Sequence, residues 1–263
     1  MEIGVSTASL FLREYNEDSL VTLNEIDART CEIFLESFSE YTEEFGKLLL
    51  SRKGNLNVHS LHVITLNFET ELFSANQRAF NDANYWFERG LSTGKLLGAH
   101  CYTMHGRARI KAGSDYDNYE KAGKRLAILC ETAAKYGIKI CLENVAWAFC
   151  SYPDFFRKVK QYAPDLMATL DIKQARRSGI DYREYIDAMG QNIKTVHISD
   201  VDENGKIKLP GEGTFDFEEL FRRLKDVGFD GDALIEVYKD DYGDVTEIKR
   251  SLDKMREIAY KIF

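Results

Sequence analysis

Eight short runs rich in β-branched and apolar residues recur along the 263-residue chain, separated by longer amphipathic stretches. The runs are residues 3–9, 31–37, 57–64, 100–106, 138–145, 166–172, 193–201 and 232–238. Their nearly continuous apolar character is typical of parallel strands whose outer face is covered by helices. The stretches between them carry apolar residues every three to four positions, as amphipathic helices do. The sequence therefore predicts eight βα units.

Several of these stretches also show helix boundaries. Residues 119–137 end at a glycine suited to a helix C-cap, residues 217–229 begin after Asp216, a natural N-cap, and residues 244–262 supply the last helix. Eight strands, each followed by a helix, within about 250 residues are what a (β/α)8 TIM barrel requires. We expect a single domain over residues 1–263, because no linker-like segment divides the chain. A doubly wound sheet is the alternative, but GVSTASLFL after the first strand is no glycine-rich phosphate loop.

Composition limits the partners and the compartment. The net charge of −8 repels polyanions, so nucleic acid is not an expected partner. No stretch reaches the roughly 18 to 20 continuous apolar residues of a membrane helix. The five cysteines are odd in number and widely spaced, and they include no CxxC pair, which favours buried thiols in a reducing compartment. We therefore expect a cytoplasmic protein with a small-molecule partner, and leave open whether it forms a homo-oligomer.

Ionisable residues stand at or near the C-terminal ends of seven consecutive predicted strands. They are Glu36, His62, His105, Glu143, Asp171, His197 and Glu236. A single carboxylate at a strand end is more often a solvated turn residue or a helix cap, but that explanation does not suit a set of seven. Because active sites of (β/α)8 barrels form at the C-terminal ends of the strands, the sequence places the candidate site there.

Three of these carboxylates follow apolar strand residues, in CLEN, ATLD and ALIEVY. Buried carboxylates are costly unless they are paired, hydrogen-bonded or bound to a metal. Together with one histidine they come from four adjacent strands and can converge on one point. We therefore predict one divalent metal ion held by Glu143, Asp171, His197 and Glu236. Such an oxygen-rich site suits Mn²⁺, Mg²⁺ or Co²⁺, and Zn²⁺ stays open.

The order of these motifs resembles the xylose isomerase-like barrel superfamily, which includes sugar isomerases, sugar epimerases and the endonuclease IV type of repair enzyme. The motifs are CLEN, TLDI, VHISD, a PGEG loop and IEVY, and the resemblance covers essentially the whole chain. It implies that a ketose or aldose binds the metal through adjacent hydroxyl and carbonyl oxygens. It also implies that the first and last metal-binding glutamates, Glu143 and Glu236, act as catalytic groups that transfer a proton through an enediolate.

Further residues are assigned to the substrate with this resemblance in view. His62 and His105 are interpreted as hydrogen-bonding groups for substrate hydroxyls, with histidines that pack in the core or support a metal ligand as the alternative. Gln174 stands where a histidine often contacts the substrate in the sugar branch. Trp147 fits an apolar pocket wall and simple packing equally well.

Other polar residues near the strand ends are less constrained. Asp200 is expected to contact the substrate or a metal ligand, and residues 202–213 are expected to form a loop over the barrel mouth. Lys173 could compensate the carboxylates or point outward. A basic segment after the fourth strand could hold a substrate phosphate or carboxylate, although a solvated loop is favoured, and it comprises Arg107, Arg109 and Lys111.

Departures from the family pattern leave the activity open. The repair enzymes carry a histidine three residues after the aspartate, where this chain has Gln174, and an Asp-x-His before the glycine loop, where it reads GKIKLPGEG. Some ketose epimerases carry a basic residue at a position occupied here by Glu203. We therefore predict a metal-dependent sugar isomerase or epimerase rather than a nuclease. Dehydration or elimination on a keto-sugar or keto-inositol and a non-catalytic sugar-binding role are the alternatives.

Overall fold

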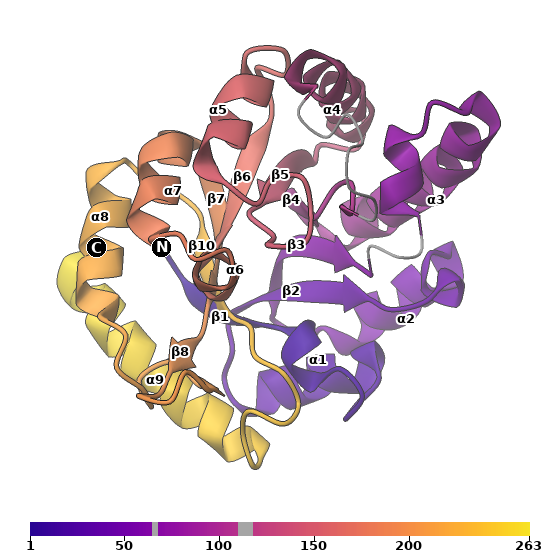
Figure 1. Cartoon of the computed structure of the whole chain (residues 1–263). Coiled ribbons are helices and arrows are strands. Elements are labelled where there is room, and N and C mark those ends of the chain that lie inside the picture. The colour runs from indigo at the N-terminus through magenta and orange to yellow at the C-terminus, as the bar shows by residue number, and fades with distance from the viewer. Residues whose placement is uncertain (65–67, 110–117) are drawn as a thin grey trace.

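The computed structural model describes residues 1–64, 68–109 and 118–263. Within these residues eight parallel strands close into a barrel in the order β1-β10-β7-β6-β5-β4-β3-β2 (Figure 1). The barrel strands are β1 (Ile3–Ser6), β2 (Thr30–Leu35), β3 (Asn57–Val63), β4 (Cys101–Met104), β5 (Lys139–Glu143), β6 (Met167–Asp171), β7 (Ile193–Ile198) and β10 (Asp232–Ile235). The prediction of a (β/α)8 barrel is confirmed.

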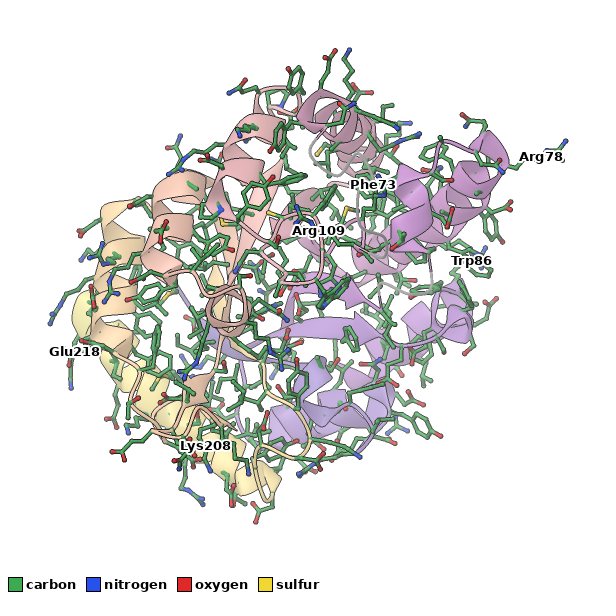
Figure 2. All side chains as sticks on the ribbon, in the orientation of Figure 1. Phe73, Arg78, Trp86, Arg109, Lys208 and Glu218 are labelled. Atoms are coloured by element: carbon green, nitrogen blue, oxygen red, sulfur yellow. The ribbon has the colours of Figure 1, made fainter. Side chains whose placement is uncertain are left out.

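Helices surround the barrel, and charged side chains such as Arg78 and Glu218 point outward from their ring (Figure 2). The described α-helices are α1 (Asn16–Glu25), α2 (Glu43–Arg52), α3 (Gln77–Leu97), α4 (Tyr119–Ala134), α5 (Pro153–Lys160), α6 (Ile172–Arg177), α7 (Tyr182–Met189), α8 (Phe217–Asp226) and α9 (Val245–Ile262). The side chain of Asp216 caps α8 as predicted, accepting the N–H of Glu219. None of these helices is long and apolar enough to cross a membrane.

Polar side chains occupy part of the barrel interior below the mouth. Thr103 on β4 donates to Glu32 on β2 and lies 3.2 Å from the hydroxyl of Thr169 on β6, although these strands are not neighbours. Such bonds can only cross the inside of the barrel. All five cysteines are buried free thiols, as expected. The helices therefore pack on the apolar outer face of the sheet, while the interior offers polar support to groups above it.

The predicted seventh strand divides in two. After β7, the pair β8 (Asp200–Val201) and β9 (Ile207–Lys208) forms a small antiparallel hairpin. The hydroxyl of Ser251 on α9 donates to the carbonyl of Pro210 at 2.8 Å, and the hairpin lies beside α9 in Figure 1. The segment predicted as a loop over the mouth is therefore a hairpin, and the chain just after β9 is hydrogen-bonded to α9.

Candidate metal centre at the barrel mouth

The structure brings the four predicted metal ligands together. Glu143 is the last residue of β5, Asp171 ends β6, His197 lies near the end of β7 and Glu236 follows β10 directly. Asp171 and His197 are paired in register on neighbouring strands. Glu143, Asp171 and His197 are at most 1% exposed. Apolar strands thus deliver three carboxylates and one imidazole to one buried point, as the sequence pattern predicts.

His197 lies at the centre of this cluster. Its Nδ1 atom is 3.0 Å from Oε2 of Glu236, 3.5 Å from Oε1 of Glu143 and 4.0 Å from Oδ2 of Asp171. Each of the four residues has a buried side-chain atom that finds no partner of hydrogen-bond geometry among the described residues. Buried polar atoms are rarely left in this state. A divalent cation bound between them would satisfy all four residues, so the donor set fits the predicted metal.

The electrostatics of the cluster also call for a cation. Burial raises the pKa of Asp171 to about 7, helped by the nearby Glu143 and Glu236 and opposed by Lys173. Burial alone would lower the pKa of His197, but Glu236 and Glu32 beside it raise that pKa well above its ordinary value. Both pKa shifts favour the protonated forms of these residues, which offset the negative charge of the carboxylates. A bound divalent ion would supply the same positive charge without protonation.

Glu32 is a member of the site that sequence reasoning missed. It lies in the middle of β2 with 0% exposure, and its Oε1 atom is 3.0 Å from Nε2 of His197. Three hydroxyl groups donate to its carboxylate, from Ser6 at 3.1 Å, Ser60 at 2.7 Å and Thr103 at 2.8 Å. The only signal in the sequence is a glutamate inside an otherwise apolar strand. Glu32, His197 and Glu236 also meet the spacing of a metal-binding group, so Glu32 borders the cluster beside Nε2 of His197.

Glu36, which the sequence placed among the residues at strand ends, is not part of the cluster. Strand β2 ends at Leu35, and the N–H of Glu36 donates to the carboxylate of Glu40. Burial and the charge of Glu40 raise the pKa of Glu36 to about 7. Strand β2 instead delivers its inward-pointing glutamate, Glu32, four residues earlier.

Lys173 points into the cluster, which resolves the alternative left open by the sequence. Its ammonium nitrogen donates to Oε1 of Glu236 at 3.1 Å and lies 3.7 Å from Oδ2 of Asp171. Burial alone would lower the pKa of Lys173, but these two carboxylates raise it above its ordinary value. The cluster therefore contains a fixed cation besides its histidines.

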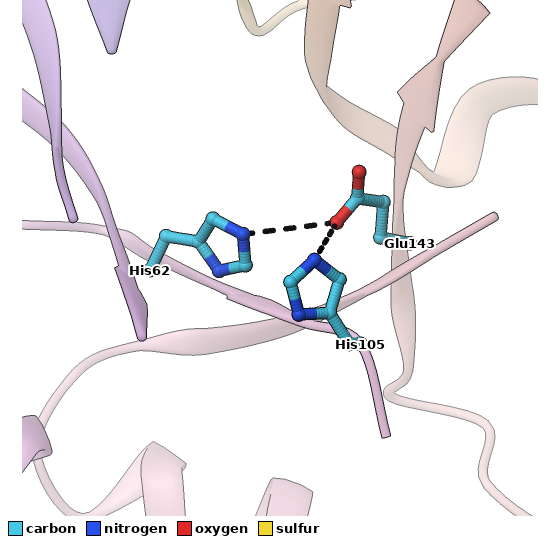
Figure 3. Close-up of side chains that lie close together, drawn as sticks. All are labelled: His62, His105 and Glu143. Atoms are coloured by element: carbon cyan, nitrogen blue, oxygen red, sulfur yellow. Dashed lines mark ion pairs between the residues drawn. The ribbon is translucent and has the colours of Figure 1, made fainter. Parts of the chain in front are cut away.

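His62 and His105 both face Glu143 (Figure 3). Nε2 of His105 is 3.0 Å from Oε2 of Glu143, and Nε2 of His62 is 3.9 Å from the same oxygen. Burial and the neighbouring His105 lower the pKa of His62 to about 4, so its imidazole is neutral near pH 7. These three residues also meet the spacing of a metal-binding group. Trp147 packs against His105 with ring centroids 5.2 Å apart and remains 41% exposed at the mouth.

The remaining predicted site residues serve the backbone around the cluster. The backbone N–H of Gln174 donates to Oδ1 of Asp171 at 2.8 Å, and its buried side-chain oxygen accepts the N–H of Ala146 at 3.4 Å. The carboxylate of Asp200 accepts four backbone N–H groups of the hairpin region, from Val201, Gly211, Gly213 and Phe215. Both oxygens of Asp200 are thus occupied with shaping this segment. In the basic segment Arg109 forms a backbone pair with Trp147, and Lys111 lies outside the described residues.

A family model described as xylose isomerase-like TIM barrel matches residues 21–258. The chain belongs to this family. Among curated proteins, an uncharacterized protein of Methanocaldococcus jannaschii is 32% identical over 153 residues, covering 51% of this chain and 48% of the relative. The fructoselysine 3-epimerase of Shigella flexneri is 26% identical over 123 residues, covering 44% and 45%. The matched segment thus spans about half the length of each curated relative.

Solved structures of the xylose isomerase-like barrel superpose over nearly the whole chain. A D-tagatose 3-epimerase-like protein has a TM-score of 0.79 at 21% identity, with 99% of both chains covered. The IolI protein with a bound zinc atom gives 0.77 at 17% identity, covering 100% of this chain and 99% of that one. A probable 3-DHS dehydratase of Bacillus anthracis gives 0.76 at 14%, covering 97% and 99%. At these identities the superpositions establish the shared fold.

Proposed function

We propose that the protein is a divalent-metal-dependent isomerase or epimerase that moves a proton on a sugar or a related keto-polyol. The observation that carries this proposal is the convergence of the four predicted ligands, each with a buried atom that lacks a hydrogen-bond partner. The epimerases among the similar proteins support the reaction class. Residues 1–263 would act as one domain with this one centre, because the barrel draws on the chain from β1 to β10.

Glu143, Asp171, His197 and Glu236 would hold the ion. The spacing of Glu143, Asp171 and His197 suits a metal ion, and the IolI structure of the same fold, which contains a bound zinc atom, supports a metal-binding role. When bound, the ion would polarise a substrate carbonyl and its neighbouring hydroxyl and thereby acidify the intervening C–H group. Mn²⁺, Mg²⁺, Co²⁺ and Zn²⁺ all match three carboxylates and one imidazole.

Glu143 and Glu236 are the groups that would take and return the proton. Glu143 ends β5 and Glu236 directly follows β10, and these are the outer two of the four neighbouring strands that carry the cluster. Each has one oxygen next to a nitrogen donor, His105 for Glu143 and Lys173 for Glu236. Two carboxylates held on opposite sides of a substrate can act as base and acid on its two faces, which is the requirement for inverting a carbon centre.

The residues around the cluster would bind the body of the substrate. His62 offers a buried imidazole and His105 a half-buried one for hydroxyl groups, and Gln174 lies beside Asp171. Trp147 leaves an aromatic surface exposed at the mouth, where the apolar C–H face of a sugar can pack. A small polyhydroxylated ligand matches this combination, whereas the net charge of −8 works against a nucleic acid.

Elimination from a keto-sugar or keto-acid is the second candidate, since the same base and metal can expel water instead of returning the proton. The structural similarity to the probable 3-DHS dehydratase supports keeping it in view. Metal-reconstituted protein incubated with a panel of ketoses, aldoses and keto-inositols in D₂O separates the two. Solvent deuterium beside the carbonyl with an otherwise intact skeleton indicates isomerisation or epimerisation, while loss of water or of a leaving group indicates elimination.

Glu236→Gln is the matched test of the proton-transfer role, and Glu257→Gln on the exposed face of α9 is its control. Loss of turnover and of deuterium exchange in the first variant alone is the expected result. Full turnover by Glu236→Gln would show that another group moves the proton, and a sugar-binding protein without catalysis would exchange no deuterium with any ligand that it binds.

A further inference from the structure

Lys173 places a positive charge inside the proposed metal centre, where the reaction scheme does not require one. It is the second residue of α6, a helix whose N-cap is Asp171 itself. Its side chain is 1% exposed, and its ammonium nitrogen lies 4.6 Å from the centre of the Tyr238 ring. The metal ligand Asp171, the helix that it starts and the aromatic ring together fix where this ammonium sits.

The ammonium separates the two oxygens of Glu236. Oε1 accepts a hydrogen bond from Lys173 at 3.1 Å, and the backbone carbonyl of Glu236 is also within 3.4 Å of the same nitrogen. Oε2 faces the other way, 3.0 Å from Nδ1 of His197, and has no partner of hydrogen-bond geometry among the described residues. One oxygen of the carboxylate is therefore tied to the lysine, and the other is turned toward the cluster.

We infer that Lys173 is a positioning residue that keeps Glu236 a one-oxygen metal ligand and holds its second oxygen, Oε1, ready for the substrate proton. A carboxylate oxygen has two lone pairs, so Oε1 can accept the lysine hydrogen bond and still take a proton. A carboxylate bound to the ion through both oxygens has no such free site. This inference rests on the proposed function. It adds that Lys173 weakens metal binding and makes proton transfer faster.

This positioning role makes a prediction that a purely structural role for Lys173 does not make. Without the ammonium, one repelling positive charge is lost and both oxygens of Glu236 can turn to the ion, so metal binding becomes tighter. Proton transfer becomes slower at the same time, because Oε1 is no longer held for it. Structural damage at this place would instead weaken metal binding, since outer partners of metal ligands normally support affinity.

The test uses Lys173→Met, Lys173→Gln and, as a control, Lys239→Met, an exposed lysine in the loop that follows Glu236. Mn²⁺, Co²⁺ and Zn²⁺ affinities are measured on metal-free protein by chelator competition, and Co²⁺ absorption and X-ray absorption report the coordination number. For Lys173→Met we expect roughly tenfold tighter metal binding, a higher coordination number and a kcat lower by about 100-fold with little change in KM.

Lys173→Gln removes the charge but retains a hydrogen-bond donor, so we expect tight metal binding with kcat partly restored relative to Lys173→Met. If metal binding is weaker or unchanged in both folded variants while the wild type binds metal and turns over substrate, the inference is wrong and the proposed function stands. If the wild type binds no metal, the proposed function itself fails. If Lys173→Met does not fold, metal affinity and kcat of Lys173→Gln still test the inference.

Discussion

Replacing Glu32 by glutamine tests whether the centre depends on a residue outside the four predicted metal ligands. Glu32 has 0% exposure and lies 3.0 Å from Nε2 of His197, whereas Glu236 lies 3.0 Å from Nδ1 of the same ring. A carboxylate there is placed to accept the Nε2 proton, which leaves Nδ1 unprotonated toward the other ligands. Carboxylates of this kind fix the tautomer and the ring orientation of a metal-binding histidine.

The size of the effect follows from what glutamine keeps and loses. The amide oxygen can still accept from His197, but the NH₂ group cannot accept from Ser60 and Thr103, which now donate at 2.7 Å and 2.8 Å. Both hydroxyls must turn, and the bond to His197 becomes a neutral one of roughly half the strength. A loss of about 1.4 to 2.7 kcal/mol corresponds to about 10- to 100-fold weaker metal binding.

The assay is chelator competition on metal-free protein, together with ¹⁵N spectra of the histidine side chains that report the His197 tautomer. Glu40→Gln is the matched control, because Glu40 is also a mostly buried glutamate and binds the backbone of Glu36 and Ser37 away from the cluster. Metal affinity within threefold of the wild type in Glu32→Gln, or an equal loss in the control, would refute the orienting role of Glu32.

Three further outcomes are expected from the same structure. Burial raises the pKa of Glu69 from 4.5 to about 7, against the lowering effect of His105. The folded state therefore holds the proton more tightly than the unfolded chain does. The folding stability that this proton binding contributes is complete below pH 4.5 and is lost as pH rises through about 7. Glu69→Gln should abolish this loss of about 3 kcal/mol in the free energy of unfolding. Urea unfolding in which the free energy of unfolding changes equally with pH in the two proteins would contradict this expectation. Gly4→Ala should destabilise the barrel by about 2 kcal/mol or more in the same assay, because its Cβ would lie 2.1 Å from the carbonyl oxygen of Thr30. Chelation should lower the thermal midpoint by several degrees if the ion binds only the folded protein, and an unchanged midpoint after proven metal removal would speak against that coupling.

Much of the fold was predictable because parallel strands that are buried on both faces have nearly continuous apolar sequences. The same signal located Glu143, Asp171 and His197, since each lies at or near the end of such a run. Glu236 was found for a related reason, as a carboxylate enclosed by apolar neighbours just after β10.

Residues inside the barrel could not be located in this way. Glu32 stands within a strand, and its importance appears only when closure of the barrel brings Ser60, Thr103 and His197 around it. The direction of Lys173 depends on where α6 begins, which is set by the Asp171 cap. The hairpin after β7 depends on the Asp200 carboxylate gathering distant backbone N–H groups, a contact that local sequence does not encode.

The most direct test of the account is elemental analysis of the purified protein after metal removal and reconstitution, comparing the wild type with Glu143→Gln and His197→Ala. The account predicts about one divalent ion per wild-type chain and loss of that ion in both variants. Near three zinc ions per chain would point to the repair-enzyme type of centre. No metal under any condition would mean that the buried carboxylates have another explanation, and the proposed catalysis would have to be abandoned.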